Sequence, residues 1–102
     1  MRRVRVQFRT TFSGPTLLEG NGTVRDLSLG GCCIETTTPI LPCLSMELRI
    51  HAPDLYWALM IDGATIKWVY GQTFGVVFSK IRERDRERLR QVIARLADEE
   101  ED

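Results

Sequence analysis

Apolar and polar residues alternate in short runs along most of the chain. In residues 4–12 every second side chain is Val, Phe or Thr, and the side chains between them are Arg, Gln or Thr. Residues 44–50 alternate in the same way. A period of two places successive side chains on opposite faces of a strand. We therefore expect a half-buried strand at each of these two places.

Three further runs are typical of strands, and turn residues separate them. Residues 23–27 follow a turn cluster at 20–22, and residues 32–37 follow a tight bend at 29–31. These breaks are rich in glycine and asparagine, which adopt turn conformations that other residues avoid. Residues 74–78 are apolar on both faces, which predicts a well-buried strand.

The stretch from residue 55 to residue 70 allows two interpretations. Its apolar-rich segments, 55–61 and 64–70, are separated by Asp62 and Gly63. An Asp-Gly pair can form a hairpin turn, but glycine also permits a bulge inside one long bent strand. Both interpretations stay open at this point. Gly71-Gln72 is a clearer turn.

The period changes near the end of the chain. Apolar residues recur there at helical spacing, and the arginines and glutamates between them form a polar face. This predicts a C-terminal helix over about residues 81–97, followed by a frayed acidic tail at 98–102. The residues at helical spacing are Leu89, Val92, Ile93 and Leu96.

Six short strands followed by one helix predict an all-β fold with a C-terminal helix. Every connection is too short for a parallel crossover, so we expect an antiparallel barrel or sandwich. Closing the sheet into a barrel also removes its exposed edges, and the helix would then cover an open end or face. The chain has 102 residues, enough for one domain, which we place at 1–97.

Composition narrows the range of functions. Lys and Arg number 14, as do Asp and Glu, so the net charge is zero. This balance argues against a general binder of nucleic acid or of membrane surfaces. No apolar run approaches the roughly 20 residues that span a bilayer, and no apolar signal core follows the basic start. We therefore expect a cytoplasmic protein that does not insert into membranes.

Residues that carry chemistry are sparse. Cys32, Cys33 and Cys43 form no Cys-x-x-Cys pair, and His51 is the only histidine. Small buried thiols in a reducing compartment are a simpler explanation than a metal or redox site. The sequence contains no Gly-rich phosphate loop with a lysine and no Gly-x-Ser-x-Gly motif. These observations favour a binding module over an enzyme, with no metal or cofactor.

Arginines gather at the start of the chain, at Arg2, Arg3, Arg5 and Arg9. Arg5 and Arg9 lie four residues apart on one expected strand, hence on one face. Guanidinium groups bind phosphate oxygens and the O6/N7 edge of guanine in a bidentate manner. A solvated basic edge that blocks strand-to-strand aggregation explains the same residues. Taken alone, the arginines favour that simpler interpretation.

A second polar feature ends the strand at 23–27. Asp26 and Ser28 alternate there with two leucines, so we expect both polar side chains to face one way. The carboxylate can accept the N1 and N2 protons of a guanine, and Gly30 and Gly31 let backbone amides approach a ligand. An ordinary Asx or Ser turn is again the simpler alternative.

Together and in this order, the two features resemble the PilZ domain family, a bacterial receptor module for cyclic di-GMP. Asp26, Ser28 and Gly31 meet the spacing Asp-x-Ser-x-x-Gly, downstream of an arginine-rich start that leads into a strand. Residues 64–68 and 74–78 follow, and then the amphipathic helix. The resemblance covers nearly the whole chain.

The resemblance implies a six-stranded antiparallel β-barrel with a C-terminal helix, binding the dinucleotide on its outer surface. Asp26 and Ser28 would contact one guanine, and the two glycines would permit the tight backbone around it. Trp68 is a candidate for stacking on a guanine, although a core position is the simpler alternative. The expected ligand-binding residues are Arg2, Arg3, Arg5, Asp26, Ser28, Gly30, Gly31 and Trp68.

The start of the chain departs from the family's Arg-x-x-x-Arg motif. Arg5 fits the second arginine, directly before the first strand, but Met1 stands where the first is expected. Arg2 and Arg3 are close enough to substitute. A literal match at Arg5 and Arg9 falls inside the strand. We expect the arginines to be mobile without ligand and ordered by it, which would change the surface seen by an effector protein.

Two alternatives accompany this prediction. The missing arginine at Met1 motivates a degenerate PilZ-like adaptor that binds a protein and no nucleotide. A small barrel that binds RNA or single-stranded DNA would need more basic and better ordered aromatic residues. The leading prediction is a bacterial, non-enzymatic cyclic di-GMP receptor with an effector-protein partner. We expect it to be a monomer or weak dimer that binds no nucleic acid polymer.

Overall fold

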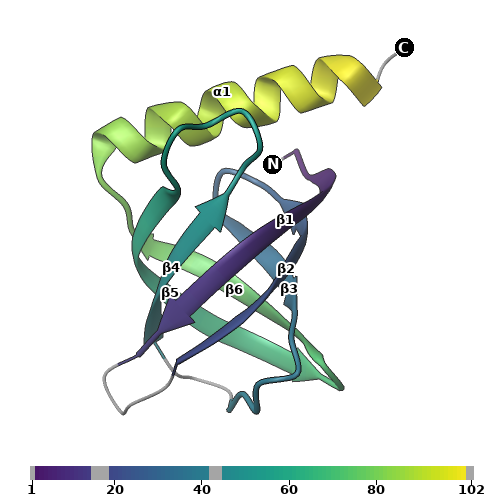
Figure 1. Cartoon of the computed structure of the whole chain (residues 1–102), viewed down its shortest axis with the longest axis vertical. Helices are drawn as coiled ribbons and strands as arrows, with labels where there is room; N and C mark the ends of the chain where they lie inside the picture. The colour runs from purple at the N-terminus through teal and green to yellow at the C-terminus, as the bar shows by residue number, and fades with distance from the viewer. Residues whose placement is uncertain (1, 15–18, 42–44, 101–102) are drawn as a thin grey trace.

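The strands close into an antiparallel barrel, and the helix lies across one end of it (Figure 1). The computed structural model describes residues 2–14, 19–41 and 45–100. Around the barrel the strands follow the order β1-β2-β3-β6-β5-β4, and β4 pairs with β1 to complete the ring. The expected antiparallel barrel with a C-terminal helix is therefore confirmed.

Strands that are consecutive in the chain are neighbours in the barrel except for β3 and β4, because β3 pairs with β6 and β4 pairs with β1. Alternation places Phe12 and Phe74 inside the barrel, where their rings meet edge to face with centroids 5.7 Å apart. The bounds are β1 Val4–Ser13, β2 Glu19–Leu27, β3 Gly31–Glu35, β4 Ser45–His51, β5 Leu59–Tyr70, β6 Thr73–Lys80 and α1 Glu83–Glu100.

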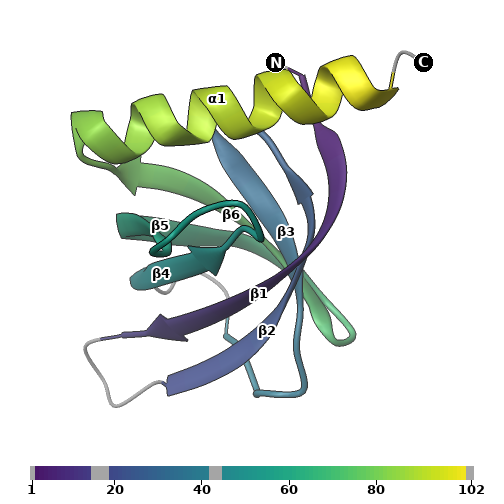
Figure 2. The same cartoon turned by 45° about the horizontal axis from the view of Figure 1, so that its top comes forward.

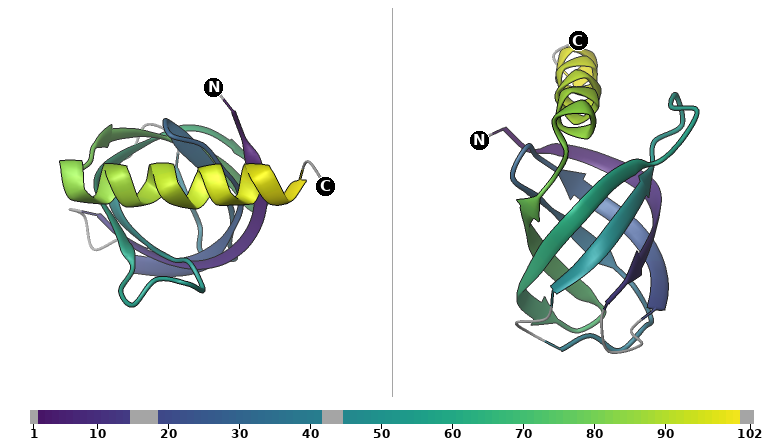
Figure 3. Two further views of the ribbon diagram at one scale, coloured as in Figure 1. Left: turned by 90° about the horizontal axis from the view of Figure 1, so that it is seen from above. Right: turned by 90° about the vertical axis from the view of Figure 1, so that its left-hand side faces the viewer.

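The helix closes the barrel because one of its faces is apolar. Leu89, Val92 and Ile93 are buried and belong to the same core as the strand residues. Seen from above, α1 crosses the open end of the barrel (Figure 3). It lies against β5 and the start of β1 (Figure 2).

The helix bounds differ from the expected 81–97 at both ends. Ile81 precedes the helix and packs against the core, so the regular turns begin at Glu83. At the other end the helix continues to Glu100 and includes the start of the expected acidic tail. Glutamate is a good helix former, and adding residues to an existing helix is easier than nucleating one. Residues 101–102 lie outside the described residues.

At two glycine-containing segments the structure corrects or decides the sequence prediction. Residues 20–22, expected as a turn, belong to β2. A Cβ on Gly22 would lie 2.4 Å from the carbonyl oxygen of Glu35, so glycine serves close strand approach there. Asp62 and Gly63 sit inside one long strand with a register shift at Gly63, so the bulge interpretation is correct.

The strand at 74–78 is less buried than expected. Phe74 and Val76 face the core, whereas Val77 is 44% exposed on the outer wall. Among the described residues, no helix combines the length and apolar character needed to cross a membrane.

Candidate functional site

A row of five residues crosses the outer wall of the barrel, one from each of five neighbouring strands. Arg5 on β1 is the cross-strand partner of Asp26 on β2, which pairs in turn with Cys33 on β3. Cys33 is opposite Gly75 on β6, and Gly75 is opposite Trp68 on β5. Strand register thus places a cation, a carboxylate and an indole along one line.

A β-bulge turns Asp26 out of the barrel. Regular alternation would place Asp26 on the same side as the buried Val24. The register between β2 and β3 shifts between these two residues, so Arg25 and Asp26 both face outward. Leu27 then returns to the core. Bulges commonly re-aim a side chain in this way.

A second bulge does the same for Trp68. Ile66 is buried, the register with β6 shifts between Ile66 and Trp68, and both Lys67 and Trp68 face outward. Val69 resumes the inward side and packs against the core. The simpler expectation of a core position for Trp68 is therefore wrong, because its side chain is 45% exposed.

The Trp68 indole packs closely against the backbone of β6 at Gly75. A Cβ on Gly75 would lie 2.2 Å from the indole Nε1 and 2.3 Å from Cε2. Real Cβ atoms do not approach other atoms so closely, so the ring requires glycine at this position. Gly75 therefore positions Trp68, which remains partly exposed to solvent.

Arg3 lies at the Asp26 side of the outer wall, away from Trp68, and it forms an ion pair with the Asp26 carboxylate. The two side chains are 58% and 31% exposed, so the pair faces solvent. Between Arg3 and Trp68 the wall forms a concavity of about 320 Å³. It is lined by Arg3, Asp26, Cys32, Cys33, Lys67, Trp68, Gly75, Val76 and Val77.

Cys33 lies in the floor of this concavity, between the carboxylate and the indole. Burial raises the pKa of its thiol, and the Asp26 charge raises that pKa further. Burial also raises the pKa of Cys32, which points into the core. Both thiols are therefore protonated at neutral pH and act as small uncharged surfaces.

The turn after β2 is held by its own hydrogen bonds. The Ser28 hydroxyl donates to the Gly31 carbonyl at 3.2 Å and accepts from the Gly30 amide at 3.3 Å. The Phe78 amide on β6 donates to the Gly30 carbonyl at 2.8 Å. Gly31 is required because a Cβ there would lie 2.2 Å from the Val76 carbonyl oxygen.

Asp26 and Ser28 consequently do not face the same way. Asp26 reaches the outer wall, whereas Ser28 is buried inside the turn, 4% exposed. The strand ends at Leu27, so alternation stops before Ser28, whose hydroxyl bonds back to Gly30 and Gly31 within the turn. In this structure Ser28, Gly30 and Gly31 shape the turn beside the concavity.

The structure brings most of the predicted residues together. Arg3, Asp26 and Trp68 line one hollow, and Arg2 and Arg5 are exposed near it at the start of β1. The sequence prediction omitted Cys33, Lys67 and Gly75, which line the same hollow. Pairing β2, β3, β6 and β5 in register would have identified Cys33 and Gly75. Within the described ranges no cluster of His, Cys, Asp and Glu is suited to hold a metal ion.

Comparisons with known proteins bear on the family and the fold. The family model for the PilZ domain matches residues 2–95. A search of curated proteins finds no match.

Solved structures share the fold at low sequence identity. The Bacillus subtilis inhibitor of motility MotI/DgrA is 17% identical, with a TM-score of 0.76, over 91% of this chain and 48% of that one. YcgR of Escherichia coli, in complex with c-di-GMP, is 14% identical, with a TM-score of 0.76, over 98% of this chain and 46% of that one. The chain thus spans about half the length of each.

A third structure matches over almost its full length. The PilZ domain of CeSA, from a cellulose synthesizing bacterium, is 12% identical, with a TM-score of 0.73, and the match covers 95% of this chain and 99% of that one. At such identities the likeness shows the shared fold.

Proposed function

Because the chain belongs to the PilZ domain family, we propose that it is a bacterial receptor for cyclic di-GMP that binds without catalysis. One observation carries the proposal: Arg3, Asp26 and Trp68 surround a single concavity on the barrel wall. An arginine, a carboxylate and an indole match the phosphates, the guanine edge and the guanine face of such a ligand.

Asp26 is the anchor for one guanine. Its carboxylate accepts hydrogen bonds, and in this structure Arg3 donates to it. The N1 and N2 protons of guanine offer donors of the same kind. Guanine therefore replaces the Arg3 guanidinium on Asp26, and Arg3 turns to the phosphates. The exchange is inexpensive because the ion pair is exposed to water.

Trp68 supplies the stacking surface. Its indole packs against Gly75 and remains partly exposed to solvent. A base stacked there contributes about 1–3 kcal/mol. Lys67, turned outward by the same bulge, adds a positive charge to the rim of the hollow.

The turn at residues 28–31 has a supporting role. Its internal hydrogen bonds fix the end of β2 and hold the turn to β6. This keeps Asp26 in place, so that its side chain need not be ordered at an entropic cost when the ligand binds. Ser28, Gly30 and Gly31 are therefore positioning residues, and Ser28 reaches a guanine only if the turn opens.

Ligand binding would alter the surface at the start of β1. Arg2, Arg3 and Arg5 carry three positive charges there. The two phosphates neutralise part of that charge and hold the arginines in one arrangement. An effector protein that contacts this end would then distinguish the bound form from the free form. This signalling step, like a cytoplasmic location, belongs to the proposal.

Isothermal titration calorimetry of the purified chain with cyclic di-GMP tests the proposal, with GTP as the control ligand. We expect saturable binding at micromolar affinity or tighter, and the stoichiometry gives the number of ligand molecules bound. The double variant Arg5→Ala with Asp26→Ala removes two contacts, and we expect a loss of about a hundredfold or more.

The matched control is Arg9→Ala, which removes an exposed arginine of the same strand. Arg9 pairs with Thr23 and does not line the concavity, so we expect affinity close to that of the unaltered chain. If Arg9→Ala weakens binding, the motif lies in the other register, at Arg5 and Arg9. Absence of heat from a folded chain would favour the alternative, a protein-binding adaptor without nucleotide affinity.

A further inference from the structure

The outward face of α1 carries charges in an ordered pattern. Five exposed side chains along this face are, in order, basic, acidic, neutral, basic and acidic. Their spacing of three or four residues places them along one line of the helix. The residues are Arg84, Glu87, Gln91, Arg95 and Asp98.

The C-terminal end of the pattern opposes the helix dipole. Asp98 and Glu99 lie near the negative end of the dipole, and the last turn contains no basic residue. At the other end, Arg84 shares the first turn with Glu83 and Asp85, which suit the dipole. The acidic end weakens the isolated helix, and a sequence that breaks a local rule often does so for function.

The pattern is complementary to itself when reversed. Arg84 and Asp98 each lie seven residues from Gln91, and Glu87 and Arg95 each lie four residues from it. A second helix that runs antiparallel and crosses at Gln91 therefore meets Arg84 with Asp98. It also brings Glu87 opposite Arg95, and both of these already have an exposed ion-pair partner within the chain. Each pair occurs twice, as a two-fold axis requires.

An exposed pair of aromatic side chains lies beside this helix face. We call residues 52–58, between β4 and β5, the aromatic loop. Tyr56 is fully exposed, Trp57 is 62% exposed, and their rings are 6.4 Å apart. Tyrosine, tryptophan and arginine are the residues most often found at the energetic centre of protein interfaces.

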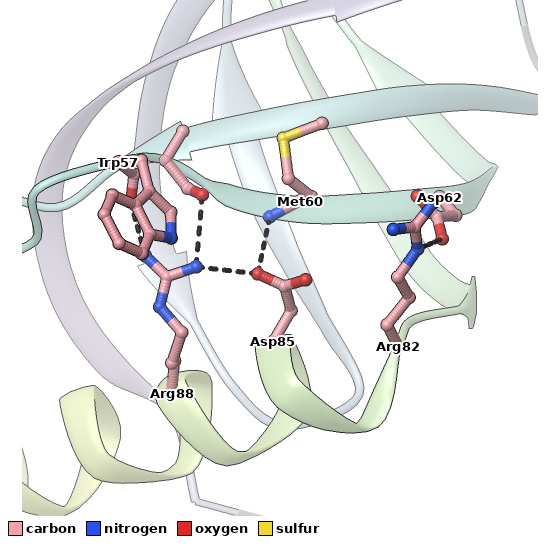
Figure 4. Close-up of polar contacts among 7 residues, drawn as sticks. Trp57, Met60, Asp62, Arg82, Asp85 and Arg88 are labelled. Carbon is pink, nitrogen blue, oxygen red and sulfur yellow. Dashed lines mark hydrogen bonds and ion pairs between the residues drawn. The ribbon is translucent and has the colours of Figure 1, made fainter.

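Two arginines of α1 hold the aromatic loop against the helix. Arg88 donates to the Trp57 carbonyl and lies over the Trp57 ring, 5.7 Å from its centroid (Figure 4). Arg95 forms an ion pair with Asp54 at 2.9 Å. The loop is thus fixed before any partner arrives, which lowers the cost of binding through it.

The same two-fold arrangement brings both aromatic loops together. The loop lies alongside residues 88–95, the stretch centred near Gln91. A two-fold axis perpendicular to two antiparallel helices keeps equivalent features on the same side of the helix pair. The two loops therefore face each other near the axis, and the opposite charges lie toward the ends. An apolar centre with a polar rim is the usual anatomy of an interface.

We propose that this face of α1, together with the aromatic loop, is the interface through which two copies of the chain associate in an antiparallel, two-fold dimer. The interface is separate from the nucleotide concavity. The N-terminus and the aromatic loop lie on opposite sides of α1 (Figure 3). Exposed ion pairs are individually weak, so the dimer is weak and sensitive to salt.

Sedimentation equilibrium of the purified chain, over a range of concentrations and at low and high salt, tests the proposal. We expect a monomer–dimer equilibrium at low salt that shifts toward monomer at high salt. Arg84→Glu and Asp98→Arg each place like charges opposite each other, twice per dimer. Each single variant should weaken the dimer by about tenfold or more.

The double variant, Arg84→Glu with Asp98→Arg, restores opposite charges across the axis. We expect it to recover the dimer, a result specific to antiparallel pairing of these two positions. Loss of helix does not explain the single-variant effects, because both substitutions favour the helix dipole. Far-UV circular dichroism checks that helical content is retained.

Arg49→Glu is the matched control, since it reverses an exposed arginine on the barrel wall. It should leave the dimer unchanged. The proposal is overturned if the unaltered chain is monomeric at low salt up to hundreds of micromolar. A dimer that is indifferent to both single variants, or one that the double variant does not restore, also overturns it.

Discussion

Two arginine–aspartate pairs of this molecule have the same chemistry in different surroundings. Arg3 and Asp26 meet on the barrel wall, with side chains 58% and 31% exposed. Arg88 and Asp85 meet between helix and barrel at 2.8 Å, with side chains 16% and 1% exposed. Water surrounds the first pair and is nearly excluded from the second.

The surroundings decide what each pair can do. An exposed pair gains little free energy, because water screens the attraction and solvates each charge equally well. Asp26 can therefore release Arg3 and accept a ligand at small cost. A buried pair has already lost its hydration, so each charge depends on the other. The first pair is suited to exchange and the second to holding the helix on the barrel.

The buried pair also organises its neighbours. Asp85 Oδ1 accepts from Arg88 and from the Met60 amide of β5, at 2.8 and 3.3 Å (Figure 4). Arg88 in turn donates to the carbonyls of Ala58 and Trp57. Asp85 Oδ2 has no hydrogen-bond partner among the described residues. Since the carboxylate is only partly satisfied, removing Arg88 would leave a costly buried charge.

Arg88→Ala is expected to have the largest effect on stability. It leaves the buried Asp85 carboxylate without its ion-pair partner and releases the aromatic loop. The free energy of unfolding should therefore fall by about 3–5 kcal/mol. Urea denaturation followed by circular dichroism measures this loss. Arg90→Ala is the control, because its pair with Glu87 is exposed and should contribute at most about 1 kcal/mol. Equal losses in the two variants would contradict the comparison.

Asp26→Ala should act on ligand binding instead of on stability. It removes the acceptor for one guanine edge, and we expect cyclic di-GMP affinity to fall about ten- to a hundredfold. The free energy of unfolding should change by less than about 1 kcal/mol, because the lost ion pair is exposed. Calorimetry and urea denaturation on the same preparation test both expectations. A large loss of stability would show that Asp26 has a structural role.

The sequence predicted the fold because the fold depends on local pattern. Alternation in β1 and β4, and helical spacing at Leu89 and Val92, indicated which faces are buried. Short connections then favoured an antiparallel barrel or sandwich, and the family resemblance implied the closed six-stranded barrel. Apart from the resemblance, these arguments use only neighbouring residues and general packing rules.

The site could be predicted only in part, because it depends on breaks in that pattern. The bulge at Arg25 turns Asp26 outward, and the bulge at Lys67 does the same for Trp68. The alternation of apolar and polar side chains along a strand does not show where either bulge lies. Gly75 and Cys33 enter the site through strand register, which links residues far apart in the chain. Family resemblance identified Asp26, while pattern alone did not place it.

Gly75→Ala tests whether the wall site depends on the Trp68 position. The added Cβ would lie 2.2 Å from the indole Nε1, so the ring must move. We expect a loss of the stacking contribution, about 1–3 kcal/mol of binding free energy. In a Trp57→Phe background, Trp68 fluorescence should respond to cyclic di-GMP, and Gly75→Ala should reduce that response. An unchanged affinity would remove Trp68 from the site.

The smallest expected effect concerns the charge that Asp26 exerts on Cys33. Burial raises the pKa of this thiol and the Asp26 carboxylate raises it further, so iodoacetamide should alkylate it slowly at neutral pH. The rate should increase as pH rises toward that pKa, because only the thiolate reacts. Asp26→Asn removes the negative charge, which lowers the Cys33 pKa and moves the rate profile to lower pH.

Mass spectrometry of tryptic peptides measures the Cys33 alkylation rate in a Cys43→Ser background, where the buried Cys32 is the internal control. Cyclic di-GMP bound over the concavity should slow the reaction, whereas GTP should not. A pH profile identical with and without the Asp26 charge would mean that water screens the wall pair more completely than the exposure of its side chains indicates. A shift to lower pH would show that the carboxylate acts across the wall on its cross-strand neighbour while it remains open to exchange.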